Sequence, residues 1–357
     1  MIEKDQKCIG VIERFRNILP VTKETPVITL LEGSTPLIKA DNIKNDMGVD
    51  FDIYLKYEGL NPTGSFKDRG MTVAVSKAAE KSARAVICAS TGNTSASASA
   101  YAVRAGIKSI VVIPEGAIAL GKLSQALIHG AKVVAVKGNF DRCLDLVREI
   151  CKKYEVEMVN SINPNRIEGQ KTASYEIAEA LGDTPDYQFM PVGNAGNITA
   201  YWKGYLELKD KVGLSSPKMM GFQAHGSSPI VEGKIFKNPQ TVATAIKIGN
   251  PASWKKAERA RDQSKGVIDR VTDEEILKAW QDLAAKEGVF VEPASAASLA
   301  GLKKYVKEQK LAARERCKVV CILTGHGLKD PDRAIKTVKR PPVVEDNIES
   351  VVKAAEI

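Results

Sequence analysis

Short apolar segments alternate with helical segments through the first half of the chain, and this alternation constrains the fold more than any other feature. The apolar segments span residues 85–89, 109–113, 132–136 and 155–159. Between the second and third, Leu120, Leu123 and Leu127 recur at helical spacing and lie on one side of a helix. Such a repeat of strand and helix predicts a parallel sheet with helices on both faces.

A second set of apolar segments follows at 187–192, 219–224 and 318–323. The chain has 357 residues, more than one ordinary domain. We therefore predict an α/β fold of two open, twisted parallel sheets with flanking helices. The expected division is a large lobe in two parts, residues 1–70 and 162–357, with a small mobile lobe of residues 71–161 inserted between them. Open α/β sheets bind ligands at the carboxyl ends of their strands, so we expect a pocket between the lobes.

The composition is that of a soluble globular protein, with 44% hydrophobic and 27% charged residues. A net charge of +9 raises the question of nucleic-acid binding, but the lysines and arginines are scattered and aromatic residues make up only 6%. We expect no nucleic-acid partner. The first seven residues lack an apolar signal core, and no segment approaches the ~20 apolar residues of a membrane span. We therefore expect a cytoplasmic protein with no membrane partner.

The six cysteines and three histidines do not have the spacing of a metal site. No two cysteines form a C-x-x-C pair, so we expect reduced thiols and no metal. Cys317 and Cys321 fall on one predicted strand, where a period of two places both on one face as packing residues. Only His326 lies beside a motif, and we expect it to neighbour the pocket rather than to act in catalysis.

One lysine occupies a tight turn between a predicted strand and a predicted helix, in the sequence Gly64-Ser65-Phe66-Lys67-Asp68-Arg69-Gly70. The strand covers residues 51–57, and the helix begins near Asp68, where an acidic residue suits the helix dipole. Lys67 therefore lies at the boundary of two elements and not on a solvated helix face. A lysine in such a position can form a Schiff base.

Two further turns, each between an apolar strand and a helix, are suited to anions. Residues 90–95 precede a helix of small residues, whose first N–H groups and dipole favour a carboxylate or a phosphate. Residues 193–197 follow the strand at 187–192, and their glycines let backbone amides approach a phosphate. This loop lacks both G-x-G-x-x-G and a final Gly-Lys-Ser/Thr, so it predicts neither a dinucleotide site nor a P-loop. With the Schiff-base lysine, the two turns predict a pocket for pyridoxal 5'-phosphate.

The motifs resemble the threonine synthases, a family of fold type II pyridoxal-phosphate enzymes related to the tryptophan synthase β chain. The three turns and the segment 324–331 occur in the order of that family, and the resemblance covers roughly residues 30 to 332. Further stretches that match lie at 160–170, 248–254 and 291–297. Ala117 and His225 depart from the family pattern, which has a lysine at the first position and a smaller or acidic residue at the second.

The resemblance implies a role for each residue of the cofactor pocket. Lys67 would carry the cofactor and act as the catalytic proton carrier. Asn93 would bond the 3'-oxygen of the cofactor ring, and Thr324 would present a hydroxyl to the pyridine nitrogen. The cofactor phosphate would be held by Gly193, Asn194, Ala195, Gly196 and Asn197.

The implied substrate is O-phospho-L-homoserine, which would react with water to give L-threonine and phosphate in a homodimeric enzyme. The candidates for binding its α-carboxylate are Ser90, Thr91, Gly92 and Thr94. The candidates for a second, distal anion are Asn160, Ser161 and Arg166. A guanidinium suits a phosphate because it can donate two parallel hydrogen bonds.

Three alternatives stay open on the sequence. A serine or threonine dehydratase needs no distal phosphate site, although the sequences around Lys67 and Thr324 favour the synthase. A cysteate synthase would take O-phosphoserine and sulfite, and its shorter substrate would shift the phosphate contacts. A catalytically inactive or RNA-binding homologue is disfavoured because the pocket groups are all present.

Overall fold

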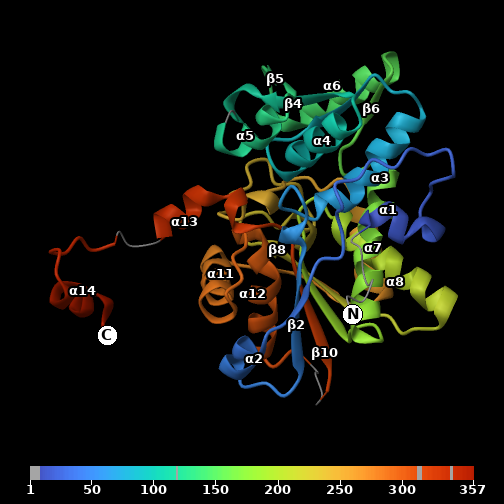
Figure 1. The fold of residues 1–357 in the computed structure, drawn as a ribbon. Coiled ribbons are helices and arrows are strands. Elements are labelled where there is room, and N and C mark those ends of the chain that lie inside the picture. Colours follow the sequence, from blue (N-terminus) through green and yellow to red (C-terminus); the bar gives the residue numbers. More distant parts are fainter. Residues whose placement is uncertain (1–8, 118–119, 312–315, 338–340) are drawn as a thin grey trace, which may run out of the picture.

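The computed structural model describes residues 9–117, 120–311, 316–337 and 341–357, which form two sheets surrounded by helices (Figure 1). Together the sheets have the α/β, mainly parallel architecture that the sequence predicts. The segments that follow strands of both sheets build the cavity between them.

The smaller sheet has four parallel strands, β3 (Ala85–Ala89), β4 (Lys108–Pro114), β5 (Lys132–Val136) and β6 (Val156–Met158), in the order β5-β4-β3-β6. Its helices are α4 (Asn93–Arg104), α5 (Leu120–Ile128) and α6 (Phe140–Lys153). We call these elements the small lobe. Along β3, Val86 and Cys88 enter one apolar cluster while Ile87 and Ala89 enter another. Both faces of the sheet are therefore buried, which explains why the strand is apolar throughout.

The larger sheet has six strands, β1 (Leu37–Lys39), β2 (Asp52–Tyr57), β7 (Tyr187–Pro191), β8 (Lys218–Ala224), β9 (Val267–Val271) and β10 (Lys318–Leu323). Their order is β1-β2-β10-β7-β8-β9, and of these strands β1 alone is antiparallel. The helices beside this sheet are α2 (Asp41–Met47), α8 (Gly196–Val212), α10 (Trp254–Gln263), α11 (Asp273–Glu287) and α12 (Pro293–Lys307). We call these elements the large lobe.

Strand β10 shows how the large lobe buries both of its faces. Val319, Cys321 and Leu323 enter one apolar cluster, and Val320 and Ile322 enter the other. β10 is the last of the described strands in the chain, yet it pairs with β2 and β7 in the middle of the sheet. Cys317 lies just before this strand and not on it, although it packs against the same cluster as Cys321.

Two helices pack against each other between the lobes, α3 (Lys67–Glu80) and α7 (Pro164–Leu181) (Figure 1). A Cβ at Gly169 of α7 would lie 1.9 Å from the carbonyl oxygen of Arg69, so the two helices can cross this closely only with glycine at that position. Because α3 also packs against α4, it links the two lobes. The division at residues 70 and 161 stays a proposal, and its first boundary lies inside α3.

The remaining described elements are short. They are α1 (Gly10–Arg14), α9 (Pro229–Glu232), α13 (Pro331–Thr337), α14 (Ile348–Ala355), and the 3-10 helices η1 (Arg16–Ile18), η2 (Glu58–Leu60), η3 (Glu115–Ala117), η4 (Thr244–Ile246) and η5 (Gly327–Lys329). None of the described helices combines the length and apolar character that crossing a bilayer requires. The described cysteines are free thiols, whereas Cys8 lies outside the described residues.

Strands β1 and β9 were not among the segments predicted from the sequence. β1 has three residues and is only half-buried, and β9 carries Asp269 and Arg270 between its apolar residues. Both strands lie at the edges of the sheet, where a strand needs neither length nor continuous apolar sequence. Edge strands of this kind leave little signal in the sequence.

Candidate active site

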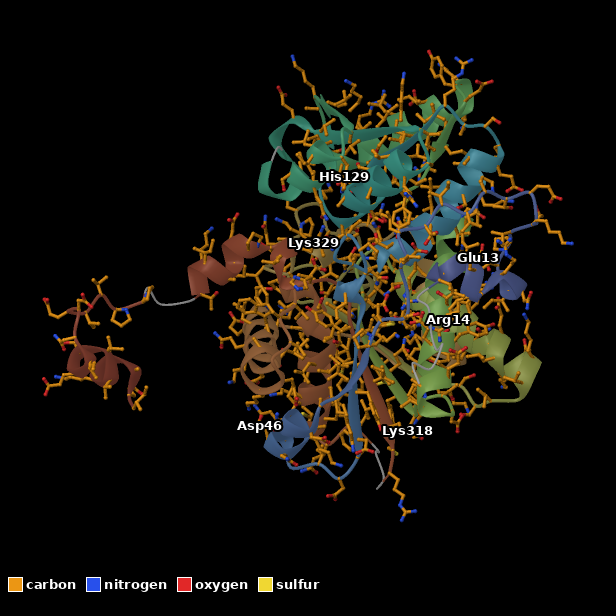
Figure 2. The ribbon with its side chains drawn as sticks, in the orientation of Figure 1. Glu13, Arg14, Asp46, His129, Lys318 and Lys329 are labelled. Carbon is orange, nitrogen blue, oxygen red and sulfur yellow. The ribbon has the colours of Figure 1, made fainter. Side chains whose placement is uncertain are left out.

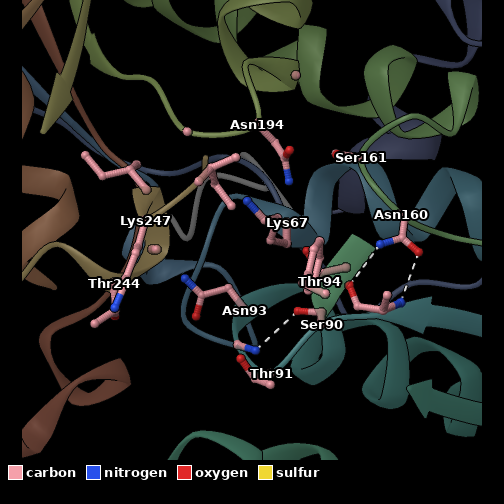
Figure 3. A pocket seen from close by; sticks show the side chains of 18 of the residues that line it. Lys67, Ser90, Thr91, Asn93, Thr94, Asn160, Ser161, Asn194, Thr244 and Lys247 are labelled. Carbon is pink, nitrogen blue, oxygen red and sulfur yellow. Dashed lines mark hydrogen bonds between the residues drawn. The ribbon is translucent and has the colours of Figure 1, made fainter. Parts of the chain in front are cut away.

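A cavity of about 2230 Å³ lies where the carboxyl ends of strands from both lobes meet (Figure 3). Its walls come from the segments that follow β2, β3, β6, β7 and β10, together with η4 and α5. Every site residue that the sequence predicts lines this one cavity, as does His326. The structure therefore brings together residues from position 67 to position 324 of the chain, although their individual roles stay predictions.

Lys67 is the first residue of α3 and extends into the cavity, between Asn93 and Asn194 (Figure 3). Its Nζ lies 3.6 Å from the centroid of the Phe66 ring. Burial and, to a lesser extent, the charge of Arg166 lower the pKa of Lys67 to about 7, while Glu292 opposes the shift. The amine is therefore poised near neutrality, as a Schiff-base and proton-transfer lysine requires.

The turn before Lys67 is fixed by the buried side chain of Asp68. This carboxylate accepts hydrogen bonds from the backbone N–H of Thr63 at 2.7 Å, from the Thr63 hydroxyl at 2.6 Å and from the Ser97 hydroxyl at 2.5 Å. Burial raises the pKa of Asp68 to about 6, although these hydrogen bonds favour the charged form. Asp68 thereby joins the turn to α4 of the small lobe.

The loop of residues 193–197 has the features of a phosphate cradle. Within the described part of the chain, the backbone N–H groups of residues 194–197 have no acceptor, and Ala195 has the left-handed φ of 64°. A Cβ at Gly193 would lie 3.0 Å from Cα of Ile246, so this position is held to glycine. The buried amide of Asn197 has no partner at either polar atom. Unpaired donors at the start of α8 fit the phosphate of pyridoxal 5'-phosphate.

Asn93 lies at the start of α4 and is held by a carboxylate that the sequence analysis did not assign. Its Nδ2 donates to Glu292, 3.2 Å from Oε1 and 3.0 Å from Oε2. Glu292 is buried, and burial raises its pKa although Asn93 and Lys67 act in the opposite direction. Glu292 lies in the stretch 291–297 that matches the family, but nothing in the local sequence indicates that it contacts Asn93.

Thr324 follows β10 and is 5% exposed, and its hydroxyl lies 3.0 Å from that of Ser295. The Ser295 hydroxyl also accepts a hydrogen bond from the backbone N–H of Gly325 at 2.9 Å. The Thr324 hydroxyl is thus held in place by α12 while it lines the cavity. This arrangement suits a single polar contact with the cofactor ring.

The residues predicted to bind substrate differ in how many partners they already have. The Asn160 amide pairs with the backbone of Ala89 in both directions, at 3.1 and 3.0 Å, and so fixes the end of β3 beside Ser90 (Figure 3). Arg166 is fully buried, yet its Nη1 donates only to the Val159 carbonyl at 3.2 Å and its Nε has no partner. Burial lowers the pKa of Arg166 to about 10. Among the described residues, no carboxylate forms an ion pair with it.

Comparisons with known proteins agree with this geometry. The family described as "Pyridoxal-phosphate dependent enzyme" matches residues 28–325. A threonine synthase of Halalkalibacterium halodurans is 56% identical over 340 residues, which are 95% of each chain. A threonine synthase of Methanocaldococcus jannaschii is 52% identical over 93% of this chain and 84% of its own.

Solved structures of other enzymes share the fold. Maize serine racemase superposes with a TM-score of 0.74 at 21% identity and covers 92% of this chain and 97% of its own. Threonine deaminase isoform 2 of Solanum lycopersicum gives a TM-score of 0.70 at 21% identity, over 91% of this chain and 83% of its own. At such identities the likeness concerns the fold alone, whereas the family is decided by the relatives above 50% identity. The chain is a pyridoxal-phosphate-dependent lyase with the type II fold, and it belongs to the threonine synthase family.

Proposed function

We propose that this enzyme converts O-phospho-L-homoserine and water into L-threonine and phosphate. The observation that carries the proposal is Arg166, a fully buried guanidinium that lines the same cavity as Lys67 and lacks a carboxylate partner among the described residues. A buried cation without a counterion is costly, so an anionic group of the substrate is its natural partner.

The cofactor, when bound, withdraws electrons from the substrate and so makes the protons on Cα and Cβ acidic. Asn194, Ala195, Gly196 and Asn197 would hold its phosphate through their unpaired N–H groups. Asn93, oriented by Glu292, has a second N–H and a carbonyl oxygen left for the ring. These contacts would fix the ring so that the reacting carbon atoms lie close to Lys67.

Lys67 would accept a proton from the substrate and return it to a different carbon. Its pKa of about 7 means that about half of the amines are neutral at neutral pH, so the group can both take up and release a proton. Asp68 and the turn before Lys67 hold the backbone from which this side chain extends. The lysine can therefore move between substrate atoms without movement of α3.

The substrate would lie between two anion sites. Its α-carboxylate would bind the N-terminus of α4 at Ser90, Thr91, Gly92 and Thr94, which form one wall of the cavity. Its phosphate would lie against Arg166 and Ser161, with Asn160 fixing the strand end beside them. Arg166 would stabilise the phosphate as it leaves Cγ, before water adds to Cβ.

The test compares two reactions of the holoenzyme. With wild-type protein, phosphate release and threonine formation from O-phosphohomoserine should proceed together. Arg166→Ala should weaken this reaction by about 2–4 kcal/mol in transition-state free energy, whereas slow dehydration of serine or threonine should change far less. Arg84→Ala is the control, because Arg84 is an exposed arginine that pairs with Glu155 and does not line the cavity.

Two results would contradict the proposal. Equal losses on both substrates would place Arg166 in the scaffold rather than at the substrate phosphate. Wild-type protein that releases no phosphate from O-phosphohomoserine would exclude the synthase reaction itself.

We also propose that the enzyme is a cytoplasmic homodimer that binds no nucleic acid. The scattered lysines and arginines and the few aromatic residues support the last point. Sedimentation of the holoenzyme measures its oligomeric state, and a monomer at micromolar concentration would contradict the homodimer.

A further inference from the structure

A half-buried lysine that the sequence did not assign to the site joins the two lobes at the cavity wall. Lys329 is the last residue of η5, and Figure 2 shows it between the small lobe, which carries His129, and the helices of the large lobe. Its Nζ donates to the Thr63 carbonyl at 3.1 Å and also to Oε1 of Gln125, on α5 of the small lobe. In the part of the chain that the structure describes, no carboxylate forms an ion pair with it.

The packing of Lys329 depends on a glycine. Gly64 has the left-handed φ of 84°, and a Cβ there would lie 3.0 Å from Cδ of Lys329. The aliphatic part of Lys329 therefore lies directly on the turn that precedes Lys67. Burial lowers the pKa of Lys329, because its ammonium is partly removed from water. A fully exposed surface lysine does not lose this solvation.

Two side chains donate to the carbonyl oxygen of Thr63. Besides Lys329, the Nε2 of Gln125 donates to this oxygen at 3.3 Å. The N–H and hydroxyl of the same Thr63 donate to Asp68, the residue next to Lys67. Thr63 therefore connects α5, η5 and the turn before Lys67.

We propose that Lys329 is a positioning residue that latches α5 of the small lobe to η5 and to the turn in front of Lys67, and so keeps the small lobe closed over the cavity. This inference goes beyond the proposed reaction, because it concerns the closure of the cavity and not the chemistry inside it. Charge-assisted hydrogen bonds suit such a latch because they are stronger than neutral ones and still reversible.

The test measures amide hydrogen exchange in the holoenzyme. Lys329→Met keeps the aliphatic stem on Gly64 and removes the ammonium, and Gln125→Met removes its acceptor. Each substitution should speed exchange in α5 about tenfold, the scale of one hydrogen bond to a charged group, and leave α8 unchanged. Gln125→Met also removes the contact of Gln125 with the Thr63 carbonyl, so the double variant should be no faster than Gln125→Met alone. Lys336→Met, an exposed lysine of α13, is the control.

Kinetics provide a second readout. If the closed form is less populated, KM should rise about tenfold while kcat changes less, and Lys329→Arg should restore both KM and exchange. Unchanged exchange in α5, additive effects in the double variant, or equally faster exchange in α8 would each overturn the latch. The exchange measurement needs no substrate, so it stands or falls separately from the proposed reaction.

Discussion

Helices α3 and α7 each contribute to two groups of charged residues that have opposite surroundings. The paired cluster consists of Lys56, Glu58, Arg69 and Glu176, and the pocket cations are Lys67 and Arg166. In the paired cluster, Nε of Arg69 lies 2.6 Å from Glu58, and its Nη2 lies 2.7 Å from Glu176. Lys56 completes the cluster with an ion pair to Glu176 at 2.8 Å.

The pocket cations come from the same helices but lack such partners. Lys67 lies two residues before Arg69 on α3, and Arg166 lies ten residues before Glu176 on α7. Arg69 and Arg166 are both 0% exposed. The difference therefore lies in the counterions and not in burial. Charge that serves the fold is matched inside the protein, whereas charge that serves binding awaits an anion from outside.

The pKa values follow the same division. Burial alone would raise the pKa of Glu176, but Arg69 and Lys56 hold it well below its usual range. In the pocket, burial lowers the pKa values of both Lys67 and Arg166, and no neighbouring carboxylate reverses the shift. Burial also lowers the pKa of Lys56, but there the ion pair with Glu176 opposes the shift, while Lys67 titrates near neutrality.

The largest effect is expected from removing the pocket lysine. Lys67→Ala should abolish turnover, with about 10²–10⁴-fold lost through proton transfer alone, and should leave the melting temperature nearly unchanged because no ion pair is broken. Lys77→Ala, on the same helix and outside the cavity, is the control for turnover, and it removes the ion pair of Lys77 with Glu80. Borohydride reduction of the yellow holoenzyme followed by peptide mapping should place the cofactor on Lys67, and an adduct on another lysine would refute this assignment.

The comparison itself is tested by the two buried arginines. Arg69→Met should lower the free energy of unfolding by about 3–5 kcal/mol, because it leaves Glu58 and Glu176 buried with too few positive charges. Arg166→Met should change it by no more than about 1 kcal/mol, since only one carbonyl contact is lost. Denaturant unfolding measures both. Equal losses would show that Arg166 also serves the fold.

The titration of Lys67 tests the electrostatic part of the comparison. In the apo-protein its amine should be charged below about pH 7 and neutral above it, about three pH units below an ordinary lysine. The pH dependence of acylation, followed on the Lys67 peptide by mass spectrometry, gives the midpoint. Arg166→Met should raise that midpoint and Glu292→Gln should lower it, because Arg166 lowers the pKa and Glu292 raises it. A midpoint near 10 would contradict the unpaired pocket.

The smallest effect on stability is expected at Asn197. Its buried amide has no partner among the described residues, so Asn197→Ala should change the free energy of unfolding by less than about 1 kcal/mol. The cofactor should nevertheless dissociate more readily, which equilibrium dialysis can measure. A loss of stability as large as that of Arg69→Met would mean that Asn197 belongs to the fold and not to the phosphate cradle.

Sequence reasoning located the strands with apolar runs more accurately than the edges of the sheets. Residues 85–89 and 318–323 form strands as predicted, because burial on both faces requires an unbroken apolar segment. Residues 132–136 also form the predicted strand, because this strand keeps an apolar run although it lies at an edge and is largely exposed. The start of α3 at Lys67 and that of α8 at Gly196 differ from expectation by one or two residues. The edge strands β1 and β9 were not predicted, because a partly exposed strand does not need an unbroken apolar segment.

The sequence by itself determined the chemistry of the site. Lys67, the small-residue turn at 90–94 and the glycine loop at 193–197 each owe their local structure to neighbouring residues, so a local pattern is sufficient to predict them. Only the tertiary structure decided which groups have partners. Glu292 meets Asn93 across 199 residues, Arg69 meets Glu176 across 107, and Lys329 meets Gln125 across 204. Whether a buried charge is paired depends on contacts between distant segments, and a local sequence pattern carries no information about those contacts.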